Sequence, residues 1–101
     1  MNLDKVVNLE DINFWLEGQD PSVAYHYSDH QNCLISQFLR YKEVPFSSVG
    51  GYTWDDSDEK FHTIPLDVRM VTLSRPWTFG AAANRASFLI SMSSRIKLFD
   101  Y

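Results

Sequence analysis

The sequence predicts an α+β fold in which helices pack against a small antiparallel sheet. Apolar residues recur at helical spacing in three separate stretches, and a stretch of alternating residues between them has the pattern of a β-hairpin. Hydrophobic residues make up 45% of the chain and aromatic residues 15%, which is enough large apolar surface for a core. With 101 residues, the chain is expected to form a single domain over 1–101.

The first predicted helix covers about residues 9–17. Asn8 is a favourable N-cap, the apolar residues that follow fall on one helical face, and Gly18 suits the position after the end. A shorter helical turn is predicted from Pro65 to about Leu73.

Two further helices are predicted, over about residues 29–42 and 76–91. Ser28 and Gln31 have the spacing of a capping box for the first of these, and Pro45 would end it. The helix over 76–91 is rich in alanine, and small side chains allow a close approach to a neighbouring helix.

The sheet is predicted as a hairpin over about residues 46–64. Residues 46–54 alternate between two faces, and 59–64 would be the return strand. Gly50 and Gly51 within the first strand indicate a bulge or a close backbone approach. The weakly alternating segment 95–100 could add an edge strand.

Composition excludes several classes of function. The formal net charge is −4 and the nine Lys and Arg form no basic run, so nucleic acid is not an expected partner. No apolar stretch has the length of a signal peptide or a membrane span, so we expect a cytoplasmic protein with no membrane partner. One cysteine allows neither an internal disulfide nor a Cys₂His₂ metal site, and no metal or other cofactor is expected.

Cys33 is the residue with the most evident chemical potential. On an ideal helix it would share a stripe with Gln37 and Arg40, away from the apolar face, and would be partly exposed or face a second contact. A position near a helix N-terminus favours the thiolate. Catalysis would also need a base, for which His62 on the return strand is the best placed, with Asp67 or Asp58 to orient it. The alternative is a structural cysteine and a plain strand histidine.

This order of a cysteine helix, a strand and a strand histidine is similar to that of papain-like and transglutaminase-like enzymes. The segment V-P-F-S-S-V-G-G-Y resembles the transglutaminase segment after the cysteine helix. The chain departs from that pattern because the helix after Cys33 is more than a turn too short and His62 has no aromatic flanks of the expected kind.

Two further motifs have plainer explanations. The run D-D-S-D-E at 55–59 lacks the glycine and the final glutamate of a calcium loop, and a solvated hairpin turn explains it. The glycine pair at 50–51 lacks the lysine and the spacing of a phosphate loop.

The aromatic residues could serve as a base-stacking platform, as core, or as anchors of a protein-binding surface. A stacking platform needs a basic groove, which favours the other two uses. The candidate binding residues are Tyr25, Tyr27, Tyr52, Trp54 and Trp77.

Three segments together resemble a loose group of short, uncharacterised bacterial and phage proteins. These segments are N-C-L-I-S-Q-F-L-R at 32–40, V-G-G-Y at 49–52, and I-P-L-D-V-R at 64–69 followed by R-P-W-T-F-G-A-A-A-N-R at 75–85. The resemblance implies an accessory protein of a phage or mobile element, and it carries over no catalytic residue.

These observations favour a non-catalytic protein that binds another protein and blocks its surface, for example a component of host defence. A thiol enzyme using Cys33 and His62 is the first alternative. A homodimeric structural module with the alanine-rich helix at its seam is the second.

Overall fold

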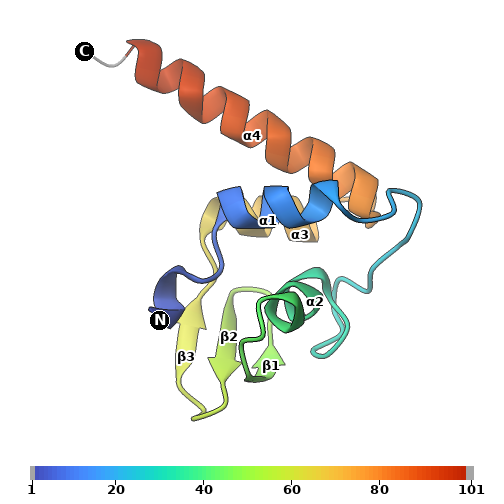
Figure 1. The fold of residues 1–101 in the computed structure, drawn as a ribbon, viewed down its shortest axis with the longest axis vertical. Coiled ribbons are helices and arrows are strands. Elements are labelled where there is room, and N and C mark those ends of the chain that lie inside the picture. The colour runs from blue at the N-terminus through green and yellow to red at the C-terminus, as the bar shows by residue number, and fades with distance from the viewer. Residues whose placement is uncertain (1, 100–101) are drawn as a thin grey trace.

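The computed structural model describes residues 2–99, and the side chains of residues 2–93. It confirms the α+β class, with helices packed on a three-stranded antiparallel sheet. The elements in chain order are the 3₁₀ turn η1 (Leu3–Lys5), α1 (Leu9–Glu17), α2 (Leu34–Tyr41), β1 (Phe46–Val49), β2 (Thr53–Asp56), β3 (Phe61–Thr63), α3 (Leu66–Leu73) and α4 (Phe79–Phe99). In Figure 1 the sheet and α2 form one end of the molecule, α1 and α3 lie above them, and α4 crosses at the far end.

Helix α1 has the predicted bounds. The side chain of Asn8 accepts a hydrogen bond from the Asp11 amide at 2.9 Å and so caps the first turn. Gly18 follows the last residue. The apolar stripe enters the core through Leu9, Ile12, Trp15 and Leu16.

Helix α2 begins five residues later than predicted, at Leu34 instead of 29. The carboxylate of Asp29 accepts hydrogen bonds from the amides of Gln31 and Asn32, and its carbonyl accepts the Cys33 amide. These local bonds hold the segment in turns, which compete with a helical start at Ser28. Cys33 is instead the N-cap.

The predicted strand 46–54 is two strands, β1 and β2, joined by a turn through Gly50, Gly51 and Tyr52. The Gly50 amide donates to the Thr53 carbonyl at 2.8 Å and closes this turn. The bulge lies between Phe46 and Ser48 instead of at the glycines. The return strand is β3, and the sheet has the order β1-β2-β3. The acidic segment 55–59 was predicted to be a turn throughout, but Asp55 and Asp56 are the last residues of β2 and only residues 57–59 lie in the β2–β3 turn.

The outer edge of β1 is covered by side chains from the turns before α2. The Nδ1 of His30 donates to the Val49 carbonyl, and the side-chain amide of Gln31 donates to the Ser47 carbonyl, both at 2.8 Å. These side chains stand where an incoming strand would pair.

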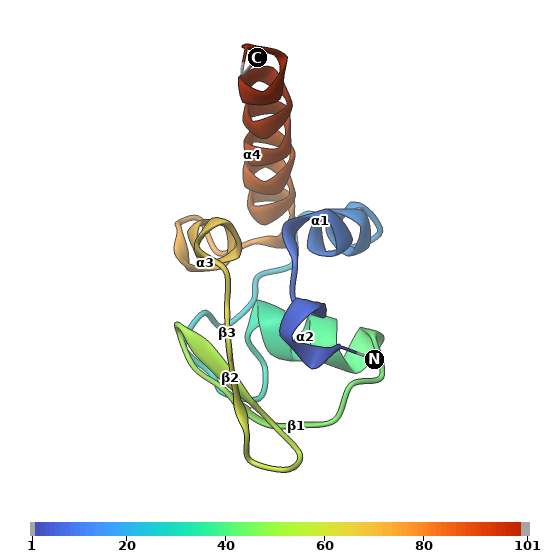
Figure 2. The same ribbon diagram turned by 90° about the vertical axis from the view of Figure 1, so that its left-hand side faces the viewer.

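Helix α4 corrects the prediction of an edge strand over 95–100. Residues 95–99 continue the helix, and residue 100 lies outside the described part of the chain. The sequence after Gly80 contains neither Gly nor Pro, so nothing in it ends the helix earlier. Figure 2 shows α1 and α3 on opposite sides of the base of α4, which then projects beyond both.

One hydrophobic cluster joins these elements. It extends from Val7 to Ala86 and includes Trp54 and Phe38, both almost fully buried. Ala82 and Ala86 are fully buried within it, so these two alanines of the predicted dimer seam are packed inside the chain. Among residues 2–99, the helices are too short or too polar for any of them to cross a bilayer.

Candidate functional site

Cys33 is buried, so of the two predicted settings the partly exposed thiol is wrong. Because α2 starts after it, Cys33 is not on the stripe shared by Gln37 and Arg40. Its Sγ lies 3.2 Å from the Ser36 hydroxyl, which donates to the carbonyl of His30 at 3.0 Å. The thiol therefore sits in a local network that ties the start of α2 to the preceding turn.

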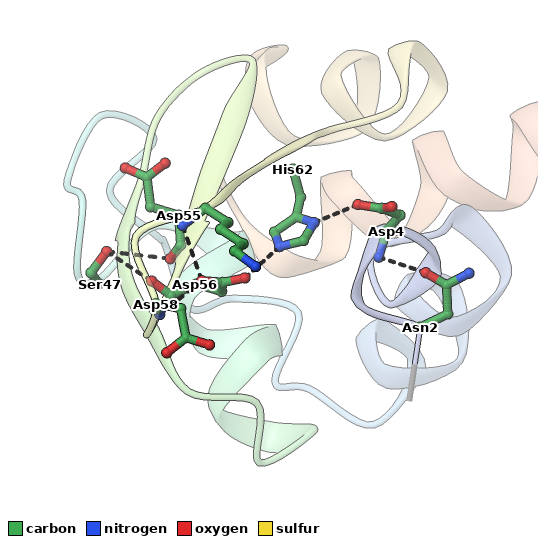
Figure 3. A network of polar contacts seen from close by, with 8 residues as sticks. Asn2, Asp4, Ser47, Asp55, Asp56, Asp58 and His62 are labelled. Carbon is green, nitrogen blue, oxygen red and sulfur yellow. Dashed lines mark hydrogen bonds and ion pairs between the residues drawn. The ribbon is translucent and has the colours of Figure 1, made fainter.

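His62 lies in a different cluster, between two carboxylates (Figure 3). Its Nε2 is 2.8 Å from the buried carboxylate of Asp56, and its Nδ1 contacts the exposed carboxylate of Asp4. The ring also stacks on Trp54, with 4.5 Å between the centroids. The contact with Asp4 connects β3 to η1 across 58 residues of sequence.

The two carboxylates favour the protonated ring, in which both nitrogens donate. The hydrogen bond to Asp56, followed by that to Asp4, raises the pKa of His62 above its usual value. The hydrogen bond from His62 in turn lowers the pKa of Asp56. A histidine held in this state has no free lone pair with which to take a proton from a thiol.

The structure does not bring the predicted catalytic residues together. The polar partner of Cys33 is Ser36, and those of His62 are Asp4 and Asp56. Asp67 is exposed in the first turn of α3, and Asp58 belongs to the β2–β3 turn. No group of three metal-ligating side chains occurs within the described part of the chain.

The five candidate binding aromatics divide between core and surface. Tyr25 and Trp54 are buried, whereas Tyr27 and Tyr52 are exposed. Tyr27 stacks on the half-buried Trp77 with 3.8 Å between ring centroids. The guanidinium of Arg69 lies over the ring of Tyr52, and that of Arg75 over the ring of Trp77.

Two of these aromatics have a structural task at the end of α3. The last four carbonyls of a helix lack partners within it, and here side chains supply all four. Ser74 donates to Met70, Arg85 to Val71, Tyr25 to Thr72, and Trp77 to Leu73.

Arg85 connects this cluster to its neighbours. Its guanidinium also donates to the Pro76 carbonyl and to the Tyr25 hydroxyl, at 3.0 and 3.1 Å. Burial raises the pKa of Tyr25, and the nearby charge of Arg85 acts in the opposite direction. Tyr25 and Trp77 therefore fix the end of α3 instead of presenting their polar atoms to a ligand.

An apolar groove of about 300 Å³ lies between α3 and α4. Phe88 on α4 is 62% exposed and Met70 on α3 is 50% exposed. The exposed residues Leu66 and Met92 extend the two walls by one helical turn each. The lining residues are Met70, Ser74, Asn84, Arg85, Phe88 and Leu89.

Sequence reasoning missed this groove, although part of its signal is present. Leu66 and Met70 are four residues apart, as are Phe88 and Met92, so each pair forms a stripe on its helix. The prediction for the helix over 76–91 rested on its alanines and did not include Phe88.

The groove is bordered by positive charge, although the chain as a whole is acidic. Eleven of the thirteen Asp and Glu precede Pro65, whereas five of the nine Lys and Arg follow it. Arg85 lines the groove, and Arg75 directly follows the lining residue Ser74. Among the side chains of residues 2–93, no carboxylate forms an ion pair with an arginine.

The cavity next to Cys33 is too small for a substrate. It is lined by Tyr25, Cys33 and Ile64 among others, and its volume is about 10 Å³, about that of one water molecule. Comparison with family models, with curated proteins and with solved structures gave no match, so function is inferred from this chain's own geometry.

Proposed function

We propose that this chain is a non-catalytic protein-binding domain that takes a helix of a partner protein into the groove between α3 and α4. The observation that carries the proposal is the exposure of Phe88 and Met70 on facing walls of one concavity. The four apolar side chains Leu66, Met70, Phe88 and Met92 expose on the order of 400 Å², within the range of patches that are often functional on monomeric proteins.

The shape favours a helix over an extended peptide. An amphipathic helix places apolar anchors at spacings of three, four and seven residues, which match a groove between two helices. The accessible surface of the lining is mostly apolar, although Ser74, Asn84 and Arg85 contribute to it, so the anchors would be aliphatic or aromatic side chains.

The charge favours acidic flanks on that helix. Helix α4 has no Asp or Glu between Phe79 and Phe99, and α3 has only Asp67. Arg75 and Arg85 would attract carboxylates beside the apolar anchors and orient the incoming helix. Screening of these charges by salt weakens the attraction.

The test uses two helical peptides with the same leucine anchors, one flanked by glutamates and one by lysines. We expect the acidic peptide to bind about tenfold more tightly at low salt, with the difference shrinking as salt is added. The change Phe88→Ala removes the central anchor of the wall and is expected to weaken binding about tenfold, as for a central interface residue.

The matched control is Phe61→Ala, which removes an equally exposed phenylalanine from β3. It should leave peptide binding unchanged. Binding of neither peptide, or equal losses in both variants, would contradict the proposal. The expectation that the natural partner is a host protein stays a prediction, which affinity capture in parallel with Phe88→Ala would test.

A further inference from the structure

The outer face of α1 has the chemistry that the α3–α4 groove is proposed to take. Glu10, Phe14 and Glu17 are all exposed, and their spacing of four and three residues places them on one face of the helix. Phe14 is 70% exposed. Phe14 is therefore an exposed aromatic side chain between two carboxylates, on a helix whose opposite face packs in the core.

Among the side chains that the structure describes, the carboxylates on this face have no cationic partner. The one Lys–carboxylate pair among residues 2–93 joins Lys42 to Asp11, and no cation pairs with Glu10 or Glu17. Glu17 accepts only a long hydrogen bond from Asn13, at 3.4 Å. Arg85 at the groove donates to carbonyls and a hydroxyl, and among the side chains of residues 2–93 neither it nor these carboxylates have an oppositely charged partner. The acidic face of α1 and the groove are therefore complementary in charge.

Geometry prevents a chain from satisfying both within itself. In Figure 2, α1 and α3 lie on opposite sides of the base of α4, so the outer face of α1 points away from the groove. A contact between them must be made by two copies.

We infer that α1 of one copy, through Glu10, Phe14 and Glu17, docks in the α3–α4 groove of a second copy. The inference rests on the proposed function, because it names an occupant of the same groove. The contact is heterologous, so a pair of copies retains one free groove, on the copy that gave its α1, and one free α1 face, on the other. Further chains can therefore add head to tail. A partner helix would then compete with self-association.

The contact is expected to be weak. The area that this contact could bury comes from the exposed apolar surface of the groove and of Phe14. It is small for a protein–protein interface and belongs with the areas of transient complexes. Self-association should therefore appear only at high concentration and should decrease with salt.

The first experiment measures mass by sedimentation over about a hundredfold range of concentration, ending near millimolar. The wild-type mass should rise past that of a dimer. Phe14→Ala and Phe88→Ala should each remain monomeric, and far-UV circular dichroism should show that both retain the fold. Glu10→Lys, which reverses one charge without touching the anchor, should weaken association several-fold at low salt.

The decisive experiment mixes the two alanine variants. Phe14→Ala retains an intact groove and Phe88→Ala retains an intact α1 face, so one contact can form and no second one can follow. The mixture should give a one-to-one dimer that does not grow. A twofold-symmetric dimer through α4 would instead survive Phe14→Ala, and that outcome would overturn the inference.

Failure of this inference is distinguishable from failure of the proposed function. A wild-type chain that stays monomeric at all concentrations overturns self-association, whereas the acidic peptide would still bind in the groove. Loss of peptide binding as well would overturn both.

Discussion

The imidazole of His62 is joined to the carboxylate of Asp56 by a hydrogen bond of 2.8 Å, with both side chains nearly buried. This pair connects β3 to β2 beneath η1 and makes the free energy of unfolding depend on pH. The hydrogen bond to Asp56 raises the pKa of His62 most, and that to Asp4 raises it further. The contribution of His62 to the free energy of unfolding is therefore complete below the ordinary histidine pKa. It is lost as pH rises through the raised value.

We therefore expect the wild-type protein to lose stability as pH rises from the ordinary histidine pKa of about 6.5 through the raised pKa of His62. Asp56 acts at the other end, because its lowered pKa gives stability that is lost only as pH falls through that lowered value. His62→Gln should flatten the alkaline decline, measured by urea unfolding at several pH values. His26→Gln, at an exposed position, is the control and should retain the decline. A decline unchanged in His62→Gln would assign it to another group.

Arg85 is expected to be a major contributor to stability although it is only partly buried. It donates to the carbonyls of Val71 and Pro76 and to the hydroxyl of Tyr25. Arg85→Met leaves the Val71 carbonyl at the end of α3 without a donor and should cost about 2–3 kcal/mol. Arg85→Lys should recover only part of the loss, because an ammonium cannot reproduce the fork of the guanidinium.

Denaturant titration of both variants tests this, with Lys60→Met as an exposed control. Equal stability of Arg85→Met and the wild type would show that water replaces the guanidinium at no cost.

Gly80 should resist replacement by alanine even though alanine is the better helix former. A Cβ at Gly80 would lie 2.7 Å from the Cβ of Pro21 and 2.9 Å from its carbonyl oxygen. Helix propensity favours Gly80→Ala by up to about 1 kcal/mol, whereas forcing this contact apart costs about 1–3 kcal/mol. We expect net destabilisation. Gly51→Ala is the matched control, because nothing lies within 4 Å of its Cβ position. Thermal unfolding should separate the two variants, and a stabilised Gly80→Ala would refute the close approach.

Cys33 provides the test of the thiol-enzyme alternative. Because its side chain is buried at the start of α2, a bulky thiol reagent should label it only as fast as the segment opens. The labelling rate should rise steeply with urea. Fast labelling of the folded protein would instead favour a reactive thiol. The unfolded chain in strong denaturant sets the upper limit of the rate.

Local sequence predicted the parts of the fold that local interactions determine. Helix α1 has its predicted bounds because its cap, Asn8, and its apolar stripe lie within a few residues of each other. The predicted start of α2 was wrong because Asp29 accepts hydrogen bonds that form turns, and the spacing of a capping box does not exclude such turns. The end of α4 was also predicted wrongly. The weak alternation over 95–100 was taken to indicate a strand, although the sequence after Gly80 contains no residue that ends a helix.

The site depended on contacts that no sequence pattern contains. His62 was identified as a residue of interest, but its partner Asp4 lies 58 residues away and came from an unpredicted 3₁₀ turn. The groove depends on the angle at which α4 leaves α3. Tyr25 was predicted as a binding residue, but its ring packs on Phe79 and its hydroxyl donates to the Thr72 carbonyl, and no sequence pattern contains these contacts.

The cover that His30 and Gln31 place on β1 has a consequence for how copies of this chain can meet. The carbonyls of Val49 and Ser47 already accept side-chain hydrogen bonds, so an incoming strand would first have to displace two donors. This edge is therefore a poor template for fibril growth at the concentrations that self-association needs. The proposed self-association through helices would therefore not lead to β-aggregation through the β1 edge of the sheet.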